Sequence, residues 1–390
     1  MAATDTTLKT KTATATIMEH FAGLEDPRVE RTKDHDLLNM ITIAICAIIC
    51  GADGWTGVET FGKAKLAWLQ TFLDLPNGIP SHDTFGRVFA RLKPEAFQNC
   101  FSRWIQAVVA VTGGQVIAID GKRLRHSYDT WSSKAAIHMV SAWASANHVV
   151  LGQRKVDAKS NEITAIPALL EILEIAGCIV TIDAMGCQKA IAQQIVDQDG
   201  YYVLAVKDNQ PYLHDDIQRL FQWADNLDFS DIVHDTVHET GKGHGRVEIR
   251  VGWTISDPTC LALLTEYAAW PQLRTVIRVQ ATRIIGTERT TETRYYISNL
   301  PADTPHLART ALHAVRRHWS IENELHWVLD IAFREDDCRI RKGFGAENMA
   351  VLRHIALNLL KQEHSQSLGI KNKRLLAGWD NNYLAKVLAI

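Results

Sequence analysis

Two aspartates of this 390-residue chain directly follow runs of β-branched and other apolar residues. Residues 116–119 lead into Asp120, and residues 179–182 lead into Asp183. Such runs are typical of buried strands, and a glycine within three residues of each aspartate indicates that the chain turns there. Two carboxylates about 4 Å apart repel each other by roughly 4 kcal/mol at an effective dielectric near 20, so they are stable as ions only around cations. The pattern therefore predicts the beginning of a metal site.

A third acid comes from a segment near the carboxyl end, where residues 307–333 have the periodicity of one helix. His318, Glu322, His326 and Asp330 recur every four positions, so they form a polar stripe within an apolar surround. A polar stripe in such a place favours a functional role. Glu322 is the glutamate of this stripe and so a candidate for a third acid.

Alternatives remain for each of these residues. A single aspartate after a strand can be a turn residue that hydrogen-bonds its own backbone. The rivals of Glu322 are Glu324, which would point away from the stripe, and the acids at 335–337, which are better placed to end the helix. A zinc site made by His318, Glu322 and His326 is a further alternative.

The expected elements around the two aspartates follow the order of a ribonuclease-H-like fold. Residues 17–111 have a mostly helical pattern, with Asp36 and Ser81 as expected N-caps. From residue 115 the pattern changes to three strands, a helix, a strand, a helix and a strand, and the acids end the first and fourth strands. We therefore predict an α/β fold, a ribonuclease-H-like mixed sheet with flanking helices.

Residues 211–304 interrupt this pattern with a short helix and then strands over 246–255, 274–285 and 291–298, which we interpret as a mainly β insertion. The predicted domains are a disordered lead-in over 1–17, a helical N-terminal domain over 18–112, the first part of the core over 113–210, the β-rich insertion over 211–304, the second part of the core over 305–362 and a C-terminal tail over 363–390.

Composition limits the functional classes. A formal net charge of −2 argues against a generally basic protein that coats DNA, so DNA contacts must come from local patches. The 7 cysteines are scattered and form no Cys-x-x-Cys pair, which predicts reduced thiols. No segment has the length and apolarity of a bilayer span. We expect a cytoplasmic protein.

Several ordered motifs resemble those of the DDE transposases of bacterial insertion sequences, most closely their H-repeat-associated branch. The motifs are Ile119-Asp120-Gly121-Lys122, Thr181-Ile182-Asp183-Ala184-Met185-Gly186-Cys187-Gln188, Lys207-Asp208-Asn209-Gln210, and residues 244–250, 295–298 and 318–327. Residues 21–28 also look like the start of that branch's N-terminal associated domain, so the resemblance covers nearly the whole chain.

The resemblance implies a catalytic triad of Asp120, Asp183 and Glu322 that holds two Mg²⁺ or Mn²⁺ ions. Two such ions would activate a water or a DNA 3′-hydroxyl and stabilise the leaving oxygen of the scissile phosphate. The implied partner is double-stranded DNA, both the terminal inverted repeats of the element and its target, and joint cutting of two ends suggests a homodimer on the DNA.

The chain also departs from the wider pattern of these enzymes. Many insertion-sequence transposases carry Tyr and Arg before the glutamate and Lys seven residues after it, whereas Val315, His318 and Leu329 occupy those positions here. We expect His318 and His326 to act as donors to DNA instead, with hydrogen bonding within the helix packing as the alternative.

Other DNA contacts are predicted from basic and amide side chains. On the strand over 246–250, alternation places Arg246, Glu248 and Arg250 on one face, and His244 precedes it, so this face could clamp phosphates. The alternative is a solvated face with an Arg–Glu pair. Residues after the first aspartate and after the last core strand should lie at the same sheet edge as the acids, and these are Lys122, Arg123, Arg125, Lys207, Asn209 and Gln210.

The predicted function is therefore a DDE transposase, a divalent-metal-dependent endonuclease and strand transferase. One alternative is a catalytically silent or domesticated DNA-binding relative. Another is a metal-dependent DNA nuclease without strand transfer.

Overall fold

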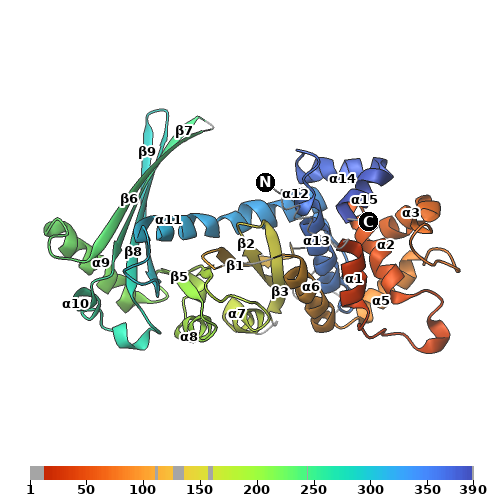
Figure 1. The fold of residues 1–390 in the computed structure, drawn as a ribbon, viewed down its shortest axis with the longest axis horizontal. Coiled ribbons are helices and arrows are strands. Elements are labelled where there is room, and N and C mark those ends of the chain that lie inside the picture. Colours follow the sequence, from red (N-terminus) through yellow and green to blue (C-terminus); the bar gives the residue numbers. More distant parts are fainter. Residues whose placement is uncertain (1–12, 110–112, 126–135, 157–160, 244, 389–390) are drawn as a thin grey trace, which may run out of the picture.

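The computed structural model describes residues 13–109, 113–125, 136–156, 161–243 and 245–388. The molecule is elongated, with a helical part at one end and a projecting set of long strands at the other (Figure 1). Nine strands form one sheet in the order β3-β2-β1-β4-β5-β9-β8-β7-β6. Their bounds are β1 Val116–Arg123, β2 His138–Ala144, β3 Val149–Val156, β4 Ile179–Ile182, β5 Tyr201–Val206, β6 His234–Gly243, β7 Arg246–Ile255, β8 Thr275–Ile285 and β9 Glu288–Ser298.

The first five strands and their connecting helices follow one another along the chain in the predicted order. β1 pairs antiparallel with β2 and parallel with β4, and β4 pairs parallel with β5. The helices α7 (Glu162–Leu170) and α8 (Lys189–Asp197) connect β3 to β4 and β4 to β5. This mixed sheet with flanking helices confirms the predicted ribonuclease-H-like α/β class.

The first strand is longer than the sequence pattern predicted. β1 continues through Asp120 to Arg123, although the prediction ended it before the aspartate. The reason lies in its two neighbours: pairing with β4 ends at Ile119 opposite Ile182, whereas pairing with β2 continues as far as Arg123 opposite His138. Asp120 therefore lies where β1 extends past the end of β4.

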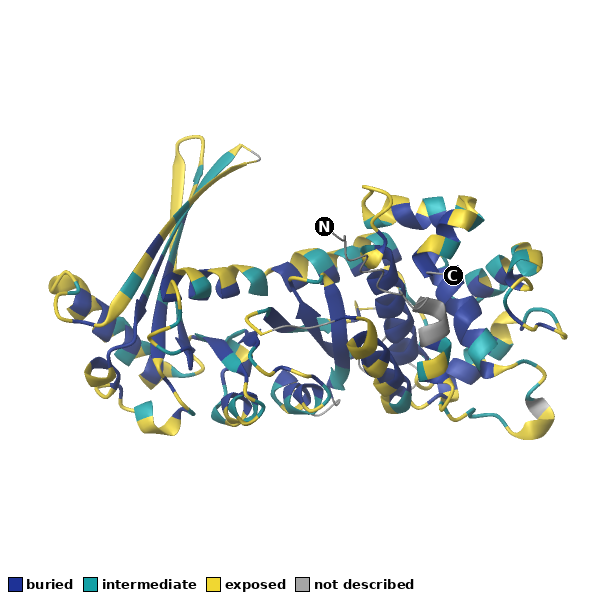
Figure 2. Cartoon of the chain, viewed as in Figure 1, coloured by how far each residue is buried: buried dark blue, intermediate teal, exposed yellow. Residues whose placement is uncertain are grey.

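The strands β6 to β9, which we call the blade, continue the same sheet through β9, which pairs antiparallel with β5. The base of the blade is buried and its far half is exposed (Figure 2). The strand β6 was not predicted, because Val237 is its one buried residue and its sequence has no apolar periodicity. The preceding helix α9 (Pro211–Asn226) has 16 residues, so the prediction of a short helix was wrong.

The helical part combines the N-terminal helices with the end of the chain. Asp36 and Ser81 cap α2 and α5 as predicted, through hydrogen bonds from Asn39 N at 2.9 Å and from Thr84 N at 3.3 Å. The almost fully buried helix α13 contacts α2, α5, α6 and β3, so it joins the helical part to the sheet. The bounds are α1 Ala13–Phe21, α2 Leu37–Ile49, α3 Trp55–Ala64, α4 Leu66–Leu69, α5 His82–Arg91, α6 Pro94–Val108, α13 Gly345–Gln362, α14 Ile370–Trp379 and α15 Asn381–Leu388.

The helix predicted over 307–333 is not uniform. It consists of α11 (Leu307–His318), a π-helical segment η5 (Ile321–His326) and α12 (Trp327–Phe333). Wide turns of this kind occur mostly as short insertions within α-helices and often at functional sites. Glu322 lies in this segment, which apolar periodicity alone did not reveal.

Within the described parts of the chain, no helix combines the length and the apolar character needed to cross a membrane. The cysteines at 46, 50, 100, 178, 187, 260 and 338 are all free.

Candidate active site

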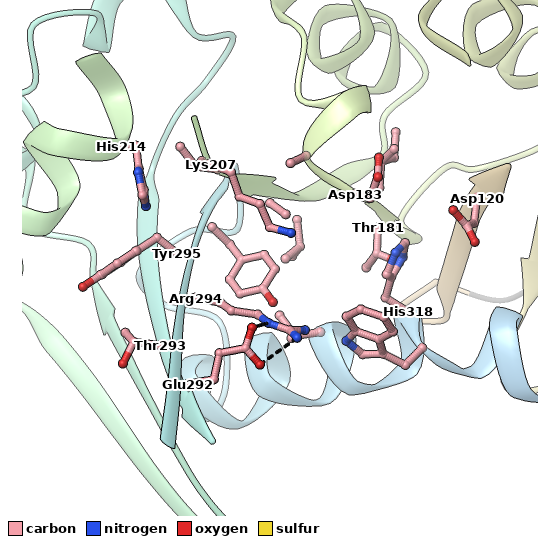
Figure 3. Close-up of a pocket in the computed structure, with 18 of the residues that line it drawn as sticks. Asp120, Thr181, Asp183, Lys207, His214, Glu292, Thr293, Arg294, Tyr295 and His318 are labelled. Atoms are coloured by element: carbon pink, nitrogen blue, oxygen red, sulfur yellow. Dashed lines mark hydrogen bonds and ion pairs between the residues drawn. The ribbon is translucent and has the colours of Figure 1, made fainter. Parts of the chain in front are cut away.

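The three acids singled out in the sequence line one cavity. Asp120, Asp183 and Glu322 all contribute to its wall, and the volume of the cavity is about 360 Å³. The wall is formed by residues of β1, β4, β5, α9, β9, α11 and η5 and of the loops after β4 and β5. Figure 3 shows the two aspartates on one side of this space and the side chains of β9 on the other. Acids that are far apart in the sequence thus line one cavity, the two aspartates from β1 and the end of β4 and Glu322 from η5.

Asp120 is held in a largely buried position, with its side chain 18% exposed. Burial is the main cause that raises the pKa of Asp120, and together with the carboxylates of Glu162, Asp183 and Glu322 it brings this pKa to about 7, although the backbone N–H of Gly121 acts in the opposite direction. Several carboxylates therefore surround Asp120 at a position that is poorly exposed to solvent, so their repulsion is weakly screened. A cation at this place would favour the ionised form of Asp120.

Asp183 follows β4 and caps the short 3₁₀ helix over Ala184–Gly186. Its Oδ1 accepts hydrogen bonds from the backbone nitrogens of Met185 at 3.0 Å and Gly186 at 3.3 Å. Burial raises the pKa of Asp183, although these hydrogen bonds and Lys207 oppose the shift. The turn that the sequence suggested as an alternative role is therefore present, and it orients one carboxylate oxygen while the residue still lines the cavity.

Glu322 is exposed and lines the cavity from η5, between the buried residues Ile321 and Leu325. Its rivals are engaged elsewhere. Glu324 contacts His148 and lies 4.0 Å from Lys361 Nζ. Glu335 is buried and pairs with Lys122. Of the acids considered in this region, Glu322 is the one on the cavity wall.

The two histidines of the polar stripe are neutral at physiological pH. His318 Nδ1 lies 3.1 Å from Thr181 Oγ1, and burial lowers the pKa of His318 to about 4. His326 Nδ1 lies 3.5 Å from Asp120 Oδ2, and burial lowers the pKa of His326 to about 3. These side chains connect the helix to β4 and β1 without adding positive charge, and their contact with DNA stays a prediction.

The donor chemistry of the cavity suits a hard divalent cation, because carboxylate oxygens are the preferred ligands of Mg²⁺ and Mn²⁺. Among the residues that the structure describes, no three His, Cys, Asp or Glu side chains are already close enough together to form a ready metal site. This applies both to the three acids and to the zinc alternative of His318, Glu322 and His326. The acids therefore fit a divalent ion by type and by shared cavity.

The other predicted DNA-binding residues near the acids fall into three groups. Lys122 is only 11% exposed and pairs with Asp330 and with Glu335 Oε2, the latter at 2.9 Å. Arg123 and Arg125 are exposed at the end of β1 and just after it. Lys207 is exposed on the cavity wall.

Asn209 and Gln210 are used within the protein. Asn209 Nδ2 donates to Ala184 O, and Gln210 Nε2 donates to Cys187 O at 2.9 Å. Both amides therefore tie the loop after β5 to the loop that carries Asp183. This contact positions the Asp183 loop, and their contact with DNA remains a prediction.

On the blade, Arg246 and Arg250 both pair with Glu248, Arg246 through Nε to Oε1 at 2.8 Å. This is the Arg–Glu pairing that the sequence left open as an alternative to a phosphate clamp. His244 lies outside the described residues.

The sequence analysis did not identify Glu162 as part of the site. Glu162, at the start of α7, pairs through Oε1 with His138 Nε2 at 2.8 Å, and its charge raises the pKa of both Asp120 and Asp183. Nothing in the local pattern of α7 distinguishes Glu162 from an ordinary acid in a first helical turn. It is a fourth carboxylate acting on the two aspartates.

Arg294 and Glu292 were also missed. Both side chains lie on β9, on the wall of the cavity, where Arg294 extends toward His318 (Figure 3). The alternation within the strand predicted over 291–298 places both side chains on one face of that strand. The sequence alone did not show that this face would lie beside the acids.

Comparison with known proteins relates the chain to transposases. Residues 112–359 match the family described as "Transposase DDE domain", and residues 18–105 match the family described as "DDE_Tnp_1-associated". The H repeat-associated putative transposase YhhI of Escherichia coli (strain K12) is 41% identical over 96% of this chain and 97% of its own length. The putative transposase YncI of Escherichia coli O157:H7 is 40% identical over 96% of this chain and 94% of its own length.

Among solved structures, the piggyBac transposase synaptic complex with hairpin DNA aligns with a TM-score of 0.39 and 10% identity, over 97% of this chain and 77% of that chain. A TM-score of this size does not by itself establish a common fold. The two family matches together cover most of the chain in the order that the motifs predicted, and two relatives match almost from end to end. The chain belongs to the DDE transposases of bacterial insertion sequences, among relatives of the H-repeat-associated type.

Proposed function

We propose that the protein cuts DNA at the ends of its insertion sequence and joins those ends to new DNA, with Asp120, Asp183 and Glu322 as the catalytic triad and ligands of two Mg²⁺ or Mn²⁺ ions. The observation that carries this proposal is the shared cavity of three acids from β1, the end of β4 and η5. When bound there, divalent ions would supply activation of the attacking oxygen and stabilisation of the leaving oxygen.

The residues of the chain itself have distinct parts in this proposal. Asp183 is oriented by the backbone nitrogens of Met185 and Gly186, so one of its oxygens has a fixed direction. Asp120 is held in a buried place that favours its protonated form, so it releases a proton when a cation joins it. Lys207 on the wall offers positive charge to the phosphate backbone.

We further propose double-stranded DNA as the partner and a homodimer as the assembly on DNA, because two ends must be cut and joined together. The basic residues at the end of β1 and on the blade are the proposed contacts with the DNA backbone. His318 and His326 act in this proposal through Thr181 and Asp120, which they contact.

The test is cleavage of a labelled duplex that carries the boundary sequence of the element encoding this chain, with Mg²⁺ or Mn²⁺ present. Asp120→Asn, Asp183→Asn and Glu322→Gln should each lower the rate of cleavage by about 100-fold or more, by analogy with the loss of one oriented electrostatic group in other active sites. Glu324→Gln is the matched control, because Glu324 lies two residues from Glu322 and contacts His148.

Three outcomes of this assay distinguish the proposed function from its alternatives. Loss of cleavage in the three variants with unchanged DNA affinity supports the triad. Cleavage by the parent without any joined product would favour a nuclease. A parent that binds the duplex but never cuts it would favour a silent DNA-binding relative and contradict the proposal.

A further inference from the structure

Arg294 has a fixed orientation in the candidate site. Its Nε donates to Glu292 Oε1 at 2.8 Å and its Nη2 to Glu292 Oε2 at 2.9 Å. Its guanidinium carbon lies 4.7 Å from the centre of the Trp319 ring, and the side chain also hydrogen-bonds Tyr296. A guanidinium has five N–H donors, and these contacts use part of them. The side chain is thus ordered before any ligand arrives.

This ordered cation stands in the cavity of the acids. Arg294 lines the same cavity as Asp183 and Glu322, from the side opposite the two aspartates (Figure 3), and its charge helps to lower the pKa of His318. The family's usual cationic positions on the helix carry His318 and Leu329 here, and His318 is neutral at physiological pH. A phosphodiester beside three carboxylates is favoured by positive charge nearby, and in this cavity Arg294 of β9 adds to the charge of Lys207.

Stability alone does not account for the pair. The side chains of Arg294 and Glu292 are 31% and 61% exposed, and ion pairs this open to water contribute only about 0–1 kcal/mol. A bidentate carboxylate holding an arginine over an indole ring is instead a way of fixing the guanidinium plane. Planar, bidentate geometry is what makes arginine suited to phosphate.

A second hollow continues from the cavity along one face of the blade. We call it the trough; its volume is about 350 Å³ and its wall includes Arg250, Ala281, Glu292, Arg294, Trp319 and Asn323. Strand pairing sets this wall, because Ala281 lies opposite both Arg250 on β7 and Glu292 on β9. Because the side chain of Ala281 is small, it leaves the trough deep between the larger side chains of Arg250 and Glu292.

The charged face continues beyond the trough. Arg283 lies opposite Glu248 in the pairing of β7 with β8, on the same face as Arg250 and Arg246. The next hollow along the blade is lined by Arg250, Arg283 and Glu292 among others. Arginines from β9, β7 and β8 therefore follow one another along this face of the blade, beginning at the cavity of the acids.

We propose that Arg294 binds the phosphate next to the scissile one, and that the DNA strand then follows the trough toward Arg250 and Arg283. This inference rests on the proposed function, because it needs DNA in the cavity of the acids. Arg294 is the residue that touches the phosphate. Glu292 is a positioning residue that acts through Arg294.

The experiment combines protein variants with single neutral phosphates. The full-length protein is given duplexes that carry the element boundary, each with one methylphosphonate at a different position on either side of the cleavage site. Cleavage rate and DNA affinity are both measured for the parent, Arg294→Ala, Arg294→Lys and Glu292→Gln. Arg289→Ala is the matched control, because Arg289 is an exposed arginine of the same strand on its opposite face.

In the parent, one neutral phosphate next to the scissile position should lower cleavage by about 100-fold, as when one oriented electrostatic contact is removed. In Arg294→Ala, cleavage of the unmodified duplex should fall by a similar factor, and the same methylphosphonate should then cause no further loss. Arg294→Lys should recover only part of the rate, since lysine keeps the charge but loses the planar fork.

Equal sensitivity to that methylphosphonate in the parent and in Arg294→Ala would overturn the inference, as would a loss in Arg289→Ala as large as in Arg294→Ala. A purely structural role would lower cleavage without removing the sensitivity to one phosphate. If the parent cuts and Asp120→Asn does not, the proposed function stands whatever Arg294 does. If the parent binds without cutting, the same pattern in DNA affinity decides the role of Arg294.

Discussion

Gly121, directly after Asp120, leaves space that the Glu162 carboxylate occupies. A β-carbon on Gly121 would lie 2.1 Å from Glu162 Oε1 and 2.6 Å from His138 Nε2. Since Glu162 and His138 pair with each other and the charge of Glu162 raises the pKa of Asp120, this glycine connects the packing of α7 to the electrostatics of the site.

Gly121→Ala should therefore push the Glu162–His138 pair out of place. We expect a loss of about 1–3 kcal/mol in the free energy of unfolding, the usual range for an added methyl group in a filled space, measured by urea denaturation. Gly241→Ala is the control, because a β-carbon on that strand glycine meets nothing within 4 Å. If the two variants had the same free energy of unfolding, the Glu162–His138 pair would be able to move aside without destabilising the protein.

The pKa of Asp120 predicts how stability depends on pH. Its pKa is about 7 in the folded protein and close to the ordinary aspartate value of 3.8 when unfolded. Between these values the folded protein binds the proton and the unfolded chain does not, so this group makes stability fall as pH rises from about 4 to about 7. One group contributes a slope of at most about 1.4 kcal/mol per pH unit.

Asp120→Asn has no proton to lose at this position. As pH rises from about 4 to about 7, the parent should therefore lose stability relative to the variant. Mg²⁺ should reduce the difference, because it stabilises the ionised carboxylate of the parent. The measurement is urea denaturation of both proteins at several pH values, with and without Mg²⁺. A pH-independent difference would contradict the buried, charge-crowded position of Asp120.

The sequence predicted best the features that short local patterns determine, such as strand ends and helix N-caps. Apolar runs that end in aspartate located Asp120 and Asp183, and the short polar caps Asp36 and Ser81 marked helix starts correctly. The four-residue stripe identified the helix face toward the core, because three of its members contact β1 or β4 through Lys122, Asp120 or Thr181. These features depend on local periodicity.

What the sequence could not supply depends on tertiary contacts. The strand β6 has almost no apolar pattern, since its neighbour β7 and the helix α11 bury little more than Val237. The length of β1 was set by its pairing with β2, which continues past the end of β4. Glu162 and Arg294 enter the site only because the sheet and helices bring distant segments together, so their types and local spacing carried no signal.

His318 should make the protein sensitive to acid. Burial lowers its pKa to about 4 from the ordinary histidine value of 6.5, so the unfolded chain binds a proton between these values and the folded protein does not. Its contribution to stability is complete above about pH 6.5 and is lost as pH falls toward 4. His318→Gln should therefore lose less stability than the parent between pH 7 and pH 5.

The comparison uses urea denaturation at both pH values, with His364→Gln as the control because His364 is exposed. His326 and His354 are also buried with a lowered pKa, so the parent keeps part of its acid sensitivity in the His318 variant. An identical loss in the parent and in His318→Gln would indicate that His318 has the same pKa in the folded and the unfolded protein, and would contradict the prediction.

Lys122 separates a structural role from a DNA-binding one. Its ammonium pairs with Asp330 and with the buried Glu335, whose other neighbour is Arg353 Nη1 at 3.6 Å. Removing one member of a buried ion pair typically costs about 3–5 kcal/mol, because the remaining charge is left uncompensated. Lys122→Met should therefore lower the free energy of unfolding by about that amount.

Lys122→Met combined with Glu335→Gln should recover part of the loss, because the neutral amide no longer needs the ammonium. Arg125→Ala, which removes a largely exposed ion pair with Asp336, should change stability by less than about 1 kcal/mol. The measurement is urea denaturation of all four proteins, with DNA affinity measured in parallel. A Lys122→Met protein as stable as the parent but weakened in DNA binding would instead favour the phosphate contact predicted from the sequence, and would mean that Asp330 and Glu335 hold Lys122 ready for DNA.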